Sequence, residues 1–173
     1  MKMYVVSDIH GHATILKRAL RKAGFDPQNS DHLLICCGDC FDRGKENRAV
    51  LEYLQSIPGK ILIRGNHEDM LERAMWRGSI SSVDVRNGTT ITIEEFFGED
   101  SIDLNGNLTL DSKICDELEQ FIHTMVDYFE TEHYVFTHGW IPLHLDYSEY
   151  RMRKDRRTAS WTAWQQARFT GWN

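Results

Sequence analysis

The sequence predicts an α/β fold that contains at least one parallel sheet. Three short apolar runs, Met3–Ser7, Leu33–Cys37 and Ile61–Ile63, have the length and composition of buried strands. Segments with helical spacing of apolar residues separate them. Strands that alternate with helices are joined by right-handed crossovers, which make neighbouring strands parallel. A polar motif follows each run directly, so the same pattern indicates where a functional site lies.

Strands and helices alternate through the first half of the chain. Apolar residues recur at helical spacing from Ile15 to Ala23, which predicts the first helix. A second helix is expected over about Asn47 to Ser56, where Pro58-Gly59 follows as a stop signal. A strand over Lys60–Ile63 and a helix over about Glu68 to Trp76 complete the unit.

The second half is less regular. From Gly78 to about Lys113 no long helical pattern persists, and Asn87-Gly88 marks a turn. We interpret residues 78–113 as a surface excursion that can serve as a lid or a substrate-recognition segment over the site. A helix is expected from Asp116 to about Met125, and Tyr134–Thr137 is a fourth apolar strand, which ends in His138.

Length and composition are those of a single domain that spans residues 1–173. Of the 173 residues, 41% are hydrophobic and 27% are charged, which is ordinary for a globular protein. The net charge of −6 argues against nucleic acid or an anionic membrane as a partner, because both attract basic surfaces. A phosphate substrate is compatible with this charge, because bound divalent cations reverse the sign of a site locally.

We expect the protein to be cytoplasmic. No stretch reaches ~20 apolar residues, the length of a membrane span, and the N-terminus runs into the first strand without a signal peptide. Cys36, Cys37 and Cys40 lie within five positions of one another, which is typical of reduced thiols rather than of a disulfide framework.

Residue types that bind metals follow each predicted strand at its carboxyl end. The motifs are Asp8-Ile9-His10, Gly38-Asp39-Cys40-Phe41-Asp42-Arg43-Gly44 and Arg64-Gly65-Asn66-His67-Glu68. Parallel strands bring these ends to one edge of the sheet, where open α/β folds bind their ligands. A single such residue usually caps a turn or forms a surface ion pair. Four successive strand ends with metal-competent residues are hard to attribute to capping.

We expect two divalent cations at this edge. Asp8 and His10 can chelate one cation, and the carboxylate of Asp39 can bridge two. Asn66 offers an oxygen and His138 a nitrogen to the second cation. A mixed nitrogen and oxygen set suits Mn, Fe or Zn better than Ca or Mg, and Mn is our first choice. Two cations ~3.5–4 Å apart polarise a phosphoryl group and lower the pKa of a bridging water.

The same motifs supply groups for a phosphate ester. Arg43 and Arg64 can clamp phosphate oxygens. His67 can protonate the leaving oxygen, a task that suits an imidazole near neutral pH. Asp42 can orient His67 and hold its tautomer. With two cations beside them, these side chains predict a site for phosphate-ester hydrolysis.

The motifs resemble the Asp-x-His, Gly-Asp-x-x-Asp-Arg-Gly and Gly-Asn-His-Glu signatures of the calcineurin-like metallophosphoesterases, and the Asp-Arg-Gly ending resembles the bacterial and phage members of the phosphoprotein phosphatase branch. The resemblance implies an α-β-β-α sandwich with the metals at the strand ends between two sheets. It also implies roles for single residues. By this resemblance, the first metal would be bound by Asp8, His10 and Asp39, and the second by Asp39, Asn66 and His138. The acid dyad would be His67 with Asp42. Phosphate would be bound by Arg43 and, further along the chain, by Arg168.

One feature of the family pattern is missing. The family carries a further histidine in a Gly-His motif on a later strand, and no such motif follows His138. We therefore expect the C-terminal strands of the second sheet to be absent and the chain to be C-terminally truncated.

The resemblance predicts a metal-dependent phosphatase of the serine/threonine type, in which a hydroxide bound to both metals attacks a phosphoserine or phosphothreonine monoester. The expected substrate is a phosphorylated protein or peptide, or a small phosphoester. A diadenosine tetraphosphate hydrolase is an alternative, because those bacterial enzymes share the pattern. A catalytically impaired scaffold or binding module is another, which the missing histidine favours and the intact pair of Asp42 and His67 opposes.

Overall fold

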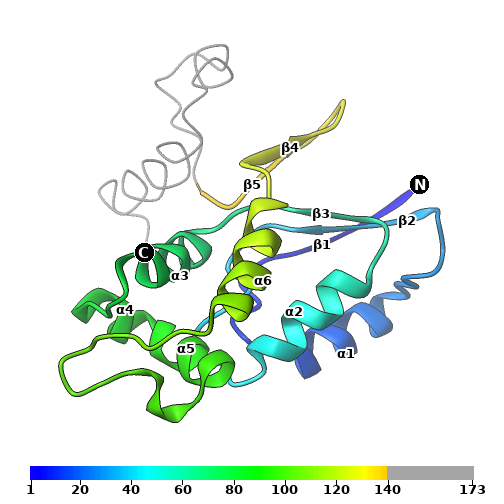
Figure 1. Cartoon of the computed structure of the whole chain (residues 1–173). Helices are drawn as coiled ribbons and strands as arrows, with labels where there is room; N and C mark the ends of the chain where they lie inside the picture. Colours follow the sequence, from blue (N-terminus) through cyan, green and yellow to red (C-terminus); the bar gives the residue numbers. More distant parts are fainter. Residues whose placement is uncertain (140–173) are drawn as a thin grey trace, which may run out of the picture.

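Three parallel strands form the centre of the fold in the order β1-β2-β3 (Figure 1). The computed structural model describes residues 1–139, so Arg168 lies outside the described part. The strands are β1 (Lys2–Val6), β2 (His32–Cys36) and β3 (Lys60–Leu62). Their predicted positions and parallel pairing are confirmed. The carboxyl ends of all three strands therefore point to one edge of the sheet.

Helices pack on one face of this sheet and supply most of the core (Figure 1). The main ones are α1 (Ala13–Ala23), α2 (Asn47–Ser56), α3 (Asn66–Arg77) and α6 (Ser112–His123). In α1, Leu16 and Leu20 are buried while Lys17 and Arg18 are exposed, which is the pattern of an amphipathic surface helix. Each of these helices was predicted, with boundaries that differ by at most a few residues.

A short antiparallel hairpin covers part of the other face. It consists of β4 (Tyr128–Glu130) and β5 (Val135–Thr137). Phe129 and Phe136 of the hairpin pack on a second core cluster around Ile35, whereas Leu34, its neighbour on β2, belongs to the helix-covered cluster. Side chains of a strand alternate between the two faces, so β2 is buried on both sides. The mixed α/β fold is confirmed; β5 was predicted and β4 was not.

The segment between α3 and α6 is more regular than the sequence indicated. It contains α4 (Ser82–Asn87), α5 (Thr89–Phe97) and a 3-10 helix, η1 (Glu99–Ser101). The predicted turn at Gly88 is real, because its φ of +87° ends α4 in a left-handed conformation that favours glycine. The sequence Thr-Thr-Ile-Thr-Ile is rich in β-branched residues with modest helix propensity, and the burial of Ile93 outweighs that preference.

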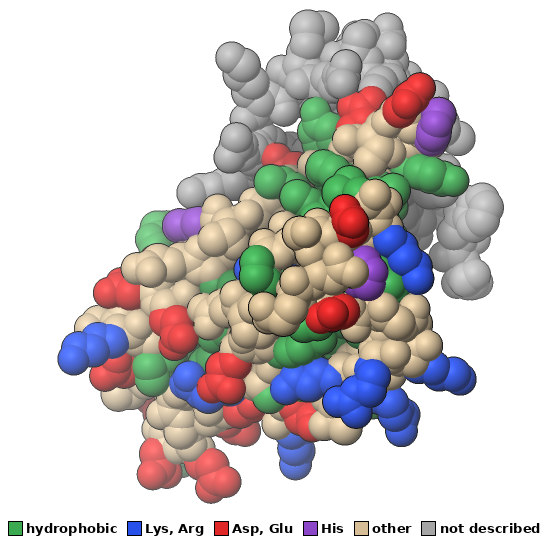
Figure 2. Space-filling view, turned by 90° about the vertical axis from the view of Figure 1, so that its right-hand side faces the viewer, with side chains coloured by type: hydrophobic (Ala, Val, Ile, Leu, Met, Phe, Trp, Pro, Cys, Tyr) green, Lys and Arg blue, Asp and Glu red, His purple; other side chains and the backbone are tan. Residues whose placement is uncertain are grey.

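The surface carries both signs of charge. Figure 2 shows Lys and Arg side chains gathered in the lower part of one face, where α1 lies, and hydrophobic side chains in its upper part. The exposed basic residues of α1 are Lys17, Arg18, Arg21 and Lys22. Among residues 1–139, the helices are too short or too polar to span a bilayer.

We expect the substitution Leu20→Ala to lower the free energy of unfolding by about 2–5 kcal/mol, because it leaves a cavity between α1 and the sheet. Ile15→Ala on the same helix is the matched control, since Ile15 is 53% exposed and Leu20 only 3%. Its effect should stay within about 0.5 kcal/mol. Urea denaturation followed by circular dichroism measures both, and equal losses would contradict the packing of α1 described above.

Candidate active site

The loops that follow β1 and β2 adopt an unusual backbone conformation. Within the described residues, the non-glycine residues with positive φ are Asp8, His10, Asp39, Asp42 and Arg43, with φ between 46° and 73°. A left-handed backbone at such residues costs about 1–3 kcal/mol each and is concentrated at functional sites. All five belong to the first two motifs, so these loops are bent to aim their side chains.

Glu68 holds the second and third motif loops together. Its carboxylate is fully buried and accepts hydrogen bonds from the backbone N–H groups of Asp39, Cys40 and Gly65 at 2.7 to 2.9 Å. No role was predicted for Glu68. A signal was present, because a glutamate three residues after the residue that precedes a helix is the pattern of a capping box.

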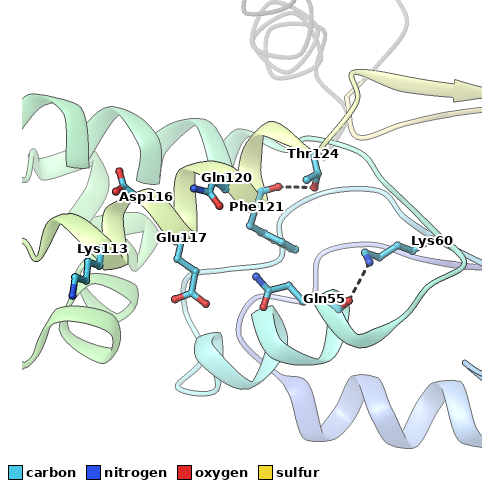
Figure 3. Close-up of a pocket in the computed structure, with 8 residues that line it drawn as sticks. All are labelled: Gln55, Lys60, Lys113, Asp116, Glu117, Gln120, Phe121 and Thr124. Atoms are coloured by element: carbon cyan, nitrogen blue, oxygen red, sulfur yellow. Dashed lines mark hydrogen bonds between the residues drawn. The ribbon is translucent and has the colours of Figure 1, made fainter.

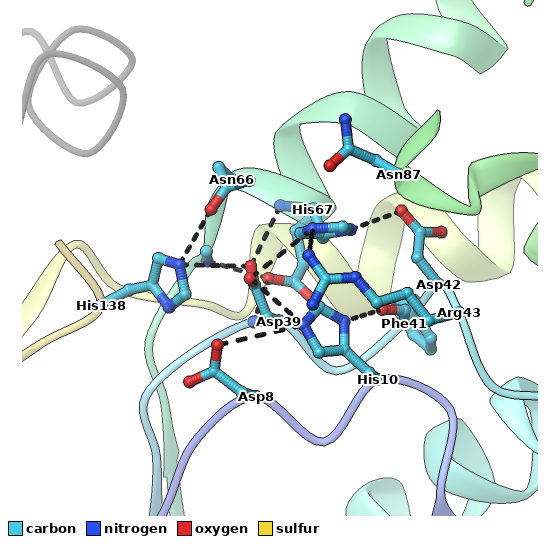
Figure 4. A network of polar contacts seen from close by, with 12 residues as sticks. Asp8, His10, Asp39, Phe41, Asp42, Arg43, Asn66, His67, Asn87 and His138 are labelled. Carbon is cyan, nitrogen blue, oxygen red and sulfur yellow. Dashed lines mark hydrogen bonds and ion pairs between the residues drawn. The ribbon is translucent and has the colours of Figure 1, made fainter. Parts of the chain in front are cut away.

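The imidazole of His10 faces two carboxylates. Its Nδ1 donates to the carbonyl oxygen of Phe41 at 3.0 Å, which leaves the lone pair on Nε2. Nε2 is buried without a hydrogen-bond partner and lies 3.8 Å from Asp39 Oδ2 and 3.9 Å from Asp8 Oδ1 (Figure 4). Burial lowers the pKa of His10, which favours the neutral form that binds metals. These three side chains could hold one cation.

A second set of donors converges on the other oxygen of Asp39. His138, at the end of β5, donates from Nδ1 to the carbonyl oxygen of Cys37 at 2.7 Å. Its Nε2 therefore faces Asn66 Oδ1 at 3.0 Å and Asp39 Oδ1 at 3.3 Å. Gly38 permits this approach because it has no side chain. A Cβ at this position would lie 2.8 Å from His138 Nδ1. One oxygen of Asp39 thus faces each set, so Asp39 would be shared by two cations held there.

The charge of Asp39 is costly in this environment. Burial and the negative charge of Glu68 raise the pKa of Asp39 to about 6, against the opposing effect of His138 and His67. A buried carboxylate that lacks a close cation favours protonation. A divalent cation between the two ligand sets would remove that penalty, so the residues present fit such a group.

Asp42 and His67 form a buried pair next to these ligands. His67 Nδ1 lies 2.7 Å from Asp42 Oδ2, and its Nε2 lies 3.2 Å from Arg43 Nη2. Burial lowers the pKa of His67, but the hydrogen bond to Asp42 and the charges of Asp39 and Asp42 outweigh it and raise the pKa. His67 also lies within reach of a cation held by His10 and Asp39. A guanidinium can only donate hydrogen bonds, so Arg43 Nη2 donates to the lone pair of Nε2 and disfavours a metal at that nitrogen.

Eight of the predicted site residues meet at the sheet edge, and Arg64 points elsewhere. The group consists of Asp8, His10, Asp39, Asp42, Arg43, Asn66, His67 and His138 (Figure 4). The guanidinium of Arg64 forms ion pairs with Asp69 and Glu72 of α3. It ties β3 to α3 there, away from the cluster around Asp39. Arg168 lies outside the described residues.

Three further residues that the sequence did not mark support Asp42. Thr89 and Thr92 donate to its two carboxylate oxygens, and Asn47 Oδ1 accepts from its backbone N–H at 3.0 Å. The two threonines are 47 and 50 positions from Asp42 along the chain, so no local motif could have identified them.

A groove of about 470 Å³ lies on another part of the molecule, between the end of α2 and α6 (Figure 3). Its walls are formed by Gln55, Lys60, Lys113, Asp116, Glu117, Gln120, Phe121 and Thr124. Lys60 Nζ donates to the carbonyl oxygens of Gln55 and Ile57, so its ammonium is held by the backbone. None of the predicted site residues within the described part of the chain contributes to this groove.

The sequence matches a known protein family. The family model described as calcineurin-like phosphoesterase matches residues 1–168. The chain belongs to the calcineurin-like phosphoesterase family. Membership implies divalent metals, for which the two ligand sets around Asp39 supply donors.

Curated relatives of this calcineurin-like phosphoesterase match a limited stretch. Serine/threonine-protein phosphatase 1 of Salmonella typhimurium is 41% identical over 68 residues, which are 39% of this chain and 30% of that protein. Serine/threonine-protein phosphatase 2 of Escherichia coli is 40% identical over 76 residues, 44% of this chain and 34% of that one. The symmetrical bis(5'-nucleosyl)-tetraphosphatase of Serratia proteamaculans is 36% identical over 69 residues, 39% and 24% of the two chains. The match therefore spans about a third or less of each relative.

Solved structures agree with the fold. A cold-active protein-tyrosine phosphatase of a psychrophilic Shewanella superimposes with a TM-score of 0.56 at 21% identity, over 92% of this chain and 47% of that one. A protein serine/threonine phosphatase of Saccharomyces cerevisiae gives a TM-score of 0.54 at 18% identity, over 81% and 38%. At these identities the likeness supports the calcineurin-like phosphoesterase fold only.

We expect the protein to bind Mn²⁺ and the substitution Asp39→Asn to weaken binding at least about 100-fold, because both ligand sets lose their shared carboxylate. The raised pKa of Asp39 adds a pH dependence: protons compete with the cation below about pH 6, so affinity should rise between about pH 5 and 7. Isothermal titration calorimetry measures both effects. Asp31→Asn, at an exposed position, should bind like the unchanged protein; unaltered binding by Asp39→Asn would contradict the site.

We expect the substitution Arg64→Met to lower the free energy of unfolding by about 1–3 kcal/mol at neutral pH, because Asp69 and Glu72 lose a partly buried ion-pair partner. Burial raises the pKa of Glu72, but the hydrogen bond and charge of Arg64 outweigh it and the pKa is lowered. A glutamate whose pKa is lowered in the folded protein stabilises the fold at pH values above its pKa in the unfolded chain, which is about 4.3. This stabilisation is lost as the pH falls through the pKa of the folded state. The difference between the two proteins should therefore narrow below about pH 4.

Denaturation at several pH values tests this, with Arg18→Met on the exposed face of α1 as the control for loss of a cation. A pH-independent difference would show that Arg64 acts through packing alone.

Proposed function

We propose that the protein is a metal-dependent phosphatase that hydrolyses phosphoserine and phosphothreonine monoesters. The observation that carries the proposal is the placement of Asp39. Its two carboxylate oxygens face two separate sets of ligands, with a histidine and aspartate pair and an arginine beside them. This is the composition of a two-metal phosphoryl-transfer site.

The residues of the chain have distinct tasks in this reaction. Two divalent cations, with Mn as our first choice and Fe or Zn as alternatives, supply polarisation of the phosphoryl oxygens and activation of a water nucleophile when bound. The guanidinium of Arg43 binds a phosphate oxygen and offsets the charge of the transition state. As an imidazolium, which its raised pKa favours, His67 donates an Nε2 proton to the leaving oxygen once the guanidinium of Arg43 has turned from Nε2 to the phosphate. Asp42 holds the other ring nitrogen.

Two substrate classes have support from the relatives. Relatives with the name serine/threonine-protein phosphatase support a phosphoprotein or phosphopeptide. The tetraphosphatase relatives, at 36% identity over a stretch of similar length, support diadenosine tetraphosphate as the second candidate. The lid or recognition role of residues 78–113 stays a prediction. We also infer a cytoplasmic location. The four cysteines are free, and the buried thiols of Cys36 and Cys40 lie only 3.7 Å apart. The reducing cytosol keeps such neighbouring thiols from forming a disulfide.

We expect Mn²⁺-dependent release of phosphate from an aryl phosphate and from a phosphoserine peptide, and its loss in Asp39→Asn. Malachite-green detection of phosphate measures both, with Asp31→Asn as the matched control. Competition between the phosphopeptide and diadenosine tetraphosphate then identifies the preferred substrate. A folded, Mn²⁺-loaded protein that hydrolyses none of these would contradict the proposal. In that case, binding of a single metal equivalent would favour the scaffold or binding module.

A further inference from the structure

The carboxylate of Asp42 is held on both oxygens by one helix. Thr89 Oγ1 donates to Oδ2 at 2.8 Å and Thr92 Oγ1 donates to Oδ1 at 2.6 Å. His67 Nδ1 donates to the same Oδ2 at 2.7 Å. Both threonines are fully buried, as is Asp42. The carboxylate therefore has one fixed plane, and its orientation toward the imidazole is set by α5.

Thr92 contacts Asp42 twice. Besides its donation to Oδ1, its hydroxyl oxygen accepts the backbone N–H of Asp42 at 3.0 Å. The φ of Asp42 is +73°, a conformation that a non-glycine residue keeps only when its surroundings hold it. Thr92 thus supports both the strained backbone and the side chain of the same residue.

Helix α5 is itself fixed to the framework. Glu95 accepts hydrogen bonds from the backbone N–H groups of Asn47 and Arg48 at 2.9 Å, at the start of α2. Phe96 packs edge to face on the buried ring of Phe41 at 6.1 Å. At the other end, a Cβ on Gly88 would lie 2.7 Å from the backbone nitrogen of Arg43. The two hydroxyls are therefore presented from a rigid element on both sides.

We propose that Thr89 and Thr92 are positioning residues for proton transfer by His67. The inference rests on the proposed function. As the bond between phosphorus and the leaving oxygen breaks, the imidazolium of His67 passes its Nε2 proton to that oxygen and becomes a neutral imidazole, whose Nδ1 proton stays hydrogen-bonded to Asp42. Rotation of the Asp42 carboxylate would turn the imidazole and misdirect Nε2. The two hydroxyls prevent that rotation.

The test uses the isosteric substitutions Thr89→Val and Thr92→Val with two substrates, p-nitrophenyl phosphate and phenyl phosphate. Phenolate is the poorer leaving group and depends more on the proton. We expect kcat for phenyl phosphate to fall about tenfold or more, a smaller fall for p-nitrophenyl phosphate, and little change in KM. Thr→Ser at either position keeps the hydroxyl and should restore the rate.

Thr90→Val is the matched control, because Thr90 is half-buried on the same helix and is not among the hydrogen-bond donors to Asp42. If Thr92→Val does not fold by circular dichroism, Thr89→Val carries the test, since it removes only one hydrogen bond to Asp42. Equal losses on both substrates, or no recovery with serine, would overturn the inference.

A second readout does not need turnover. In ¹H–¹⁵N spectra of the protein, the His67 Nδ1 proton should give a resolved downfield resonance because of its hydrogen bond to Asp42. The resonance should broaden or shift in the two valine variants and return in the serine variants. An unchanged resonance in both valine variants overturns the inference. If the unsubstituted protein hydrolyses neither substrate, the proposed function fails, and this measurement alone decides the role of the two threonines.

Discussion

The buried carboxylate of Asp39 is the constraint on which the rest of the site depends. It lies close to a second buried acid, Glu68, whose charge raises its pKa. An ionised Asp39 therefore needs a compensating positive charge. The candidate ligands His10 and His138 each donate one ring nitrogen to a backbone carbonyl and turn the other nitrogen toward Asp39. A cation resolves this conflict, and metal binding therefore also stabilises the fold.

Asp39 can connect two ligand sets only because two layers of the fold meet at it. His10 lies in the loop after β1 and Asn66 begins α3 after β3, so both belong to the layer of the parallel sheet, whereas His138 directly follows β5 of the antiparallel hairpin. The hairpin is positioned by Phe129 and Phe136 on the cluster around Ile35. Half of the candidate metal site thus depends on the smaller hydrophobic core, not on the larger one beneath the helices.

Short-range patterns predicted the parts of the structure that are local in the chain. The strand ends and their motifs were located correctly, because alternation of strands and helices determines where carboxyl ends gather. Such a pattern could not predict in which direction the side chain of Arg64 points. Its spacing from Asn66 fits a phosphate clamp equally well, but two acids one and two turns into α3 compete for its guanidinium. Only the packing of α3 against β3 decides between them.

The sequence did not indicate the role of Thr89 and Thr92, for a different reason. They occur in a β-branched stretch that resembles a strand as much as a helix, and their partner is about 50 positions earlier. Because α5 is bound to α2 and to Phe41, this part of the 78–113 segment belongs to the framework of the site.

That placement bears on substrate choice. Relatives of both names match this chain over stretches of 68 to 76 residues at 36–41% identity, so the shared part does not separate a phosphopeptide from a dinucleotide. Selectivity must come from residues around the shared centre. Helix α4 joins α5 at Gly88, against the backbone of Arg43. It extends from the framework next to the residue proposed to bind phosphate, which is where a side chain can contact the remainder of a substrate.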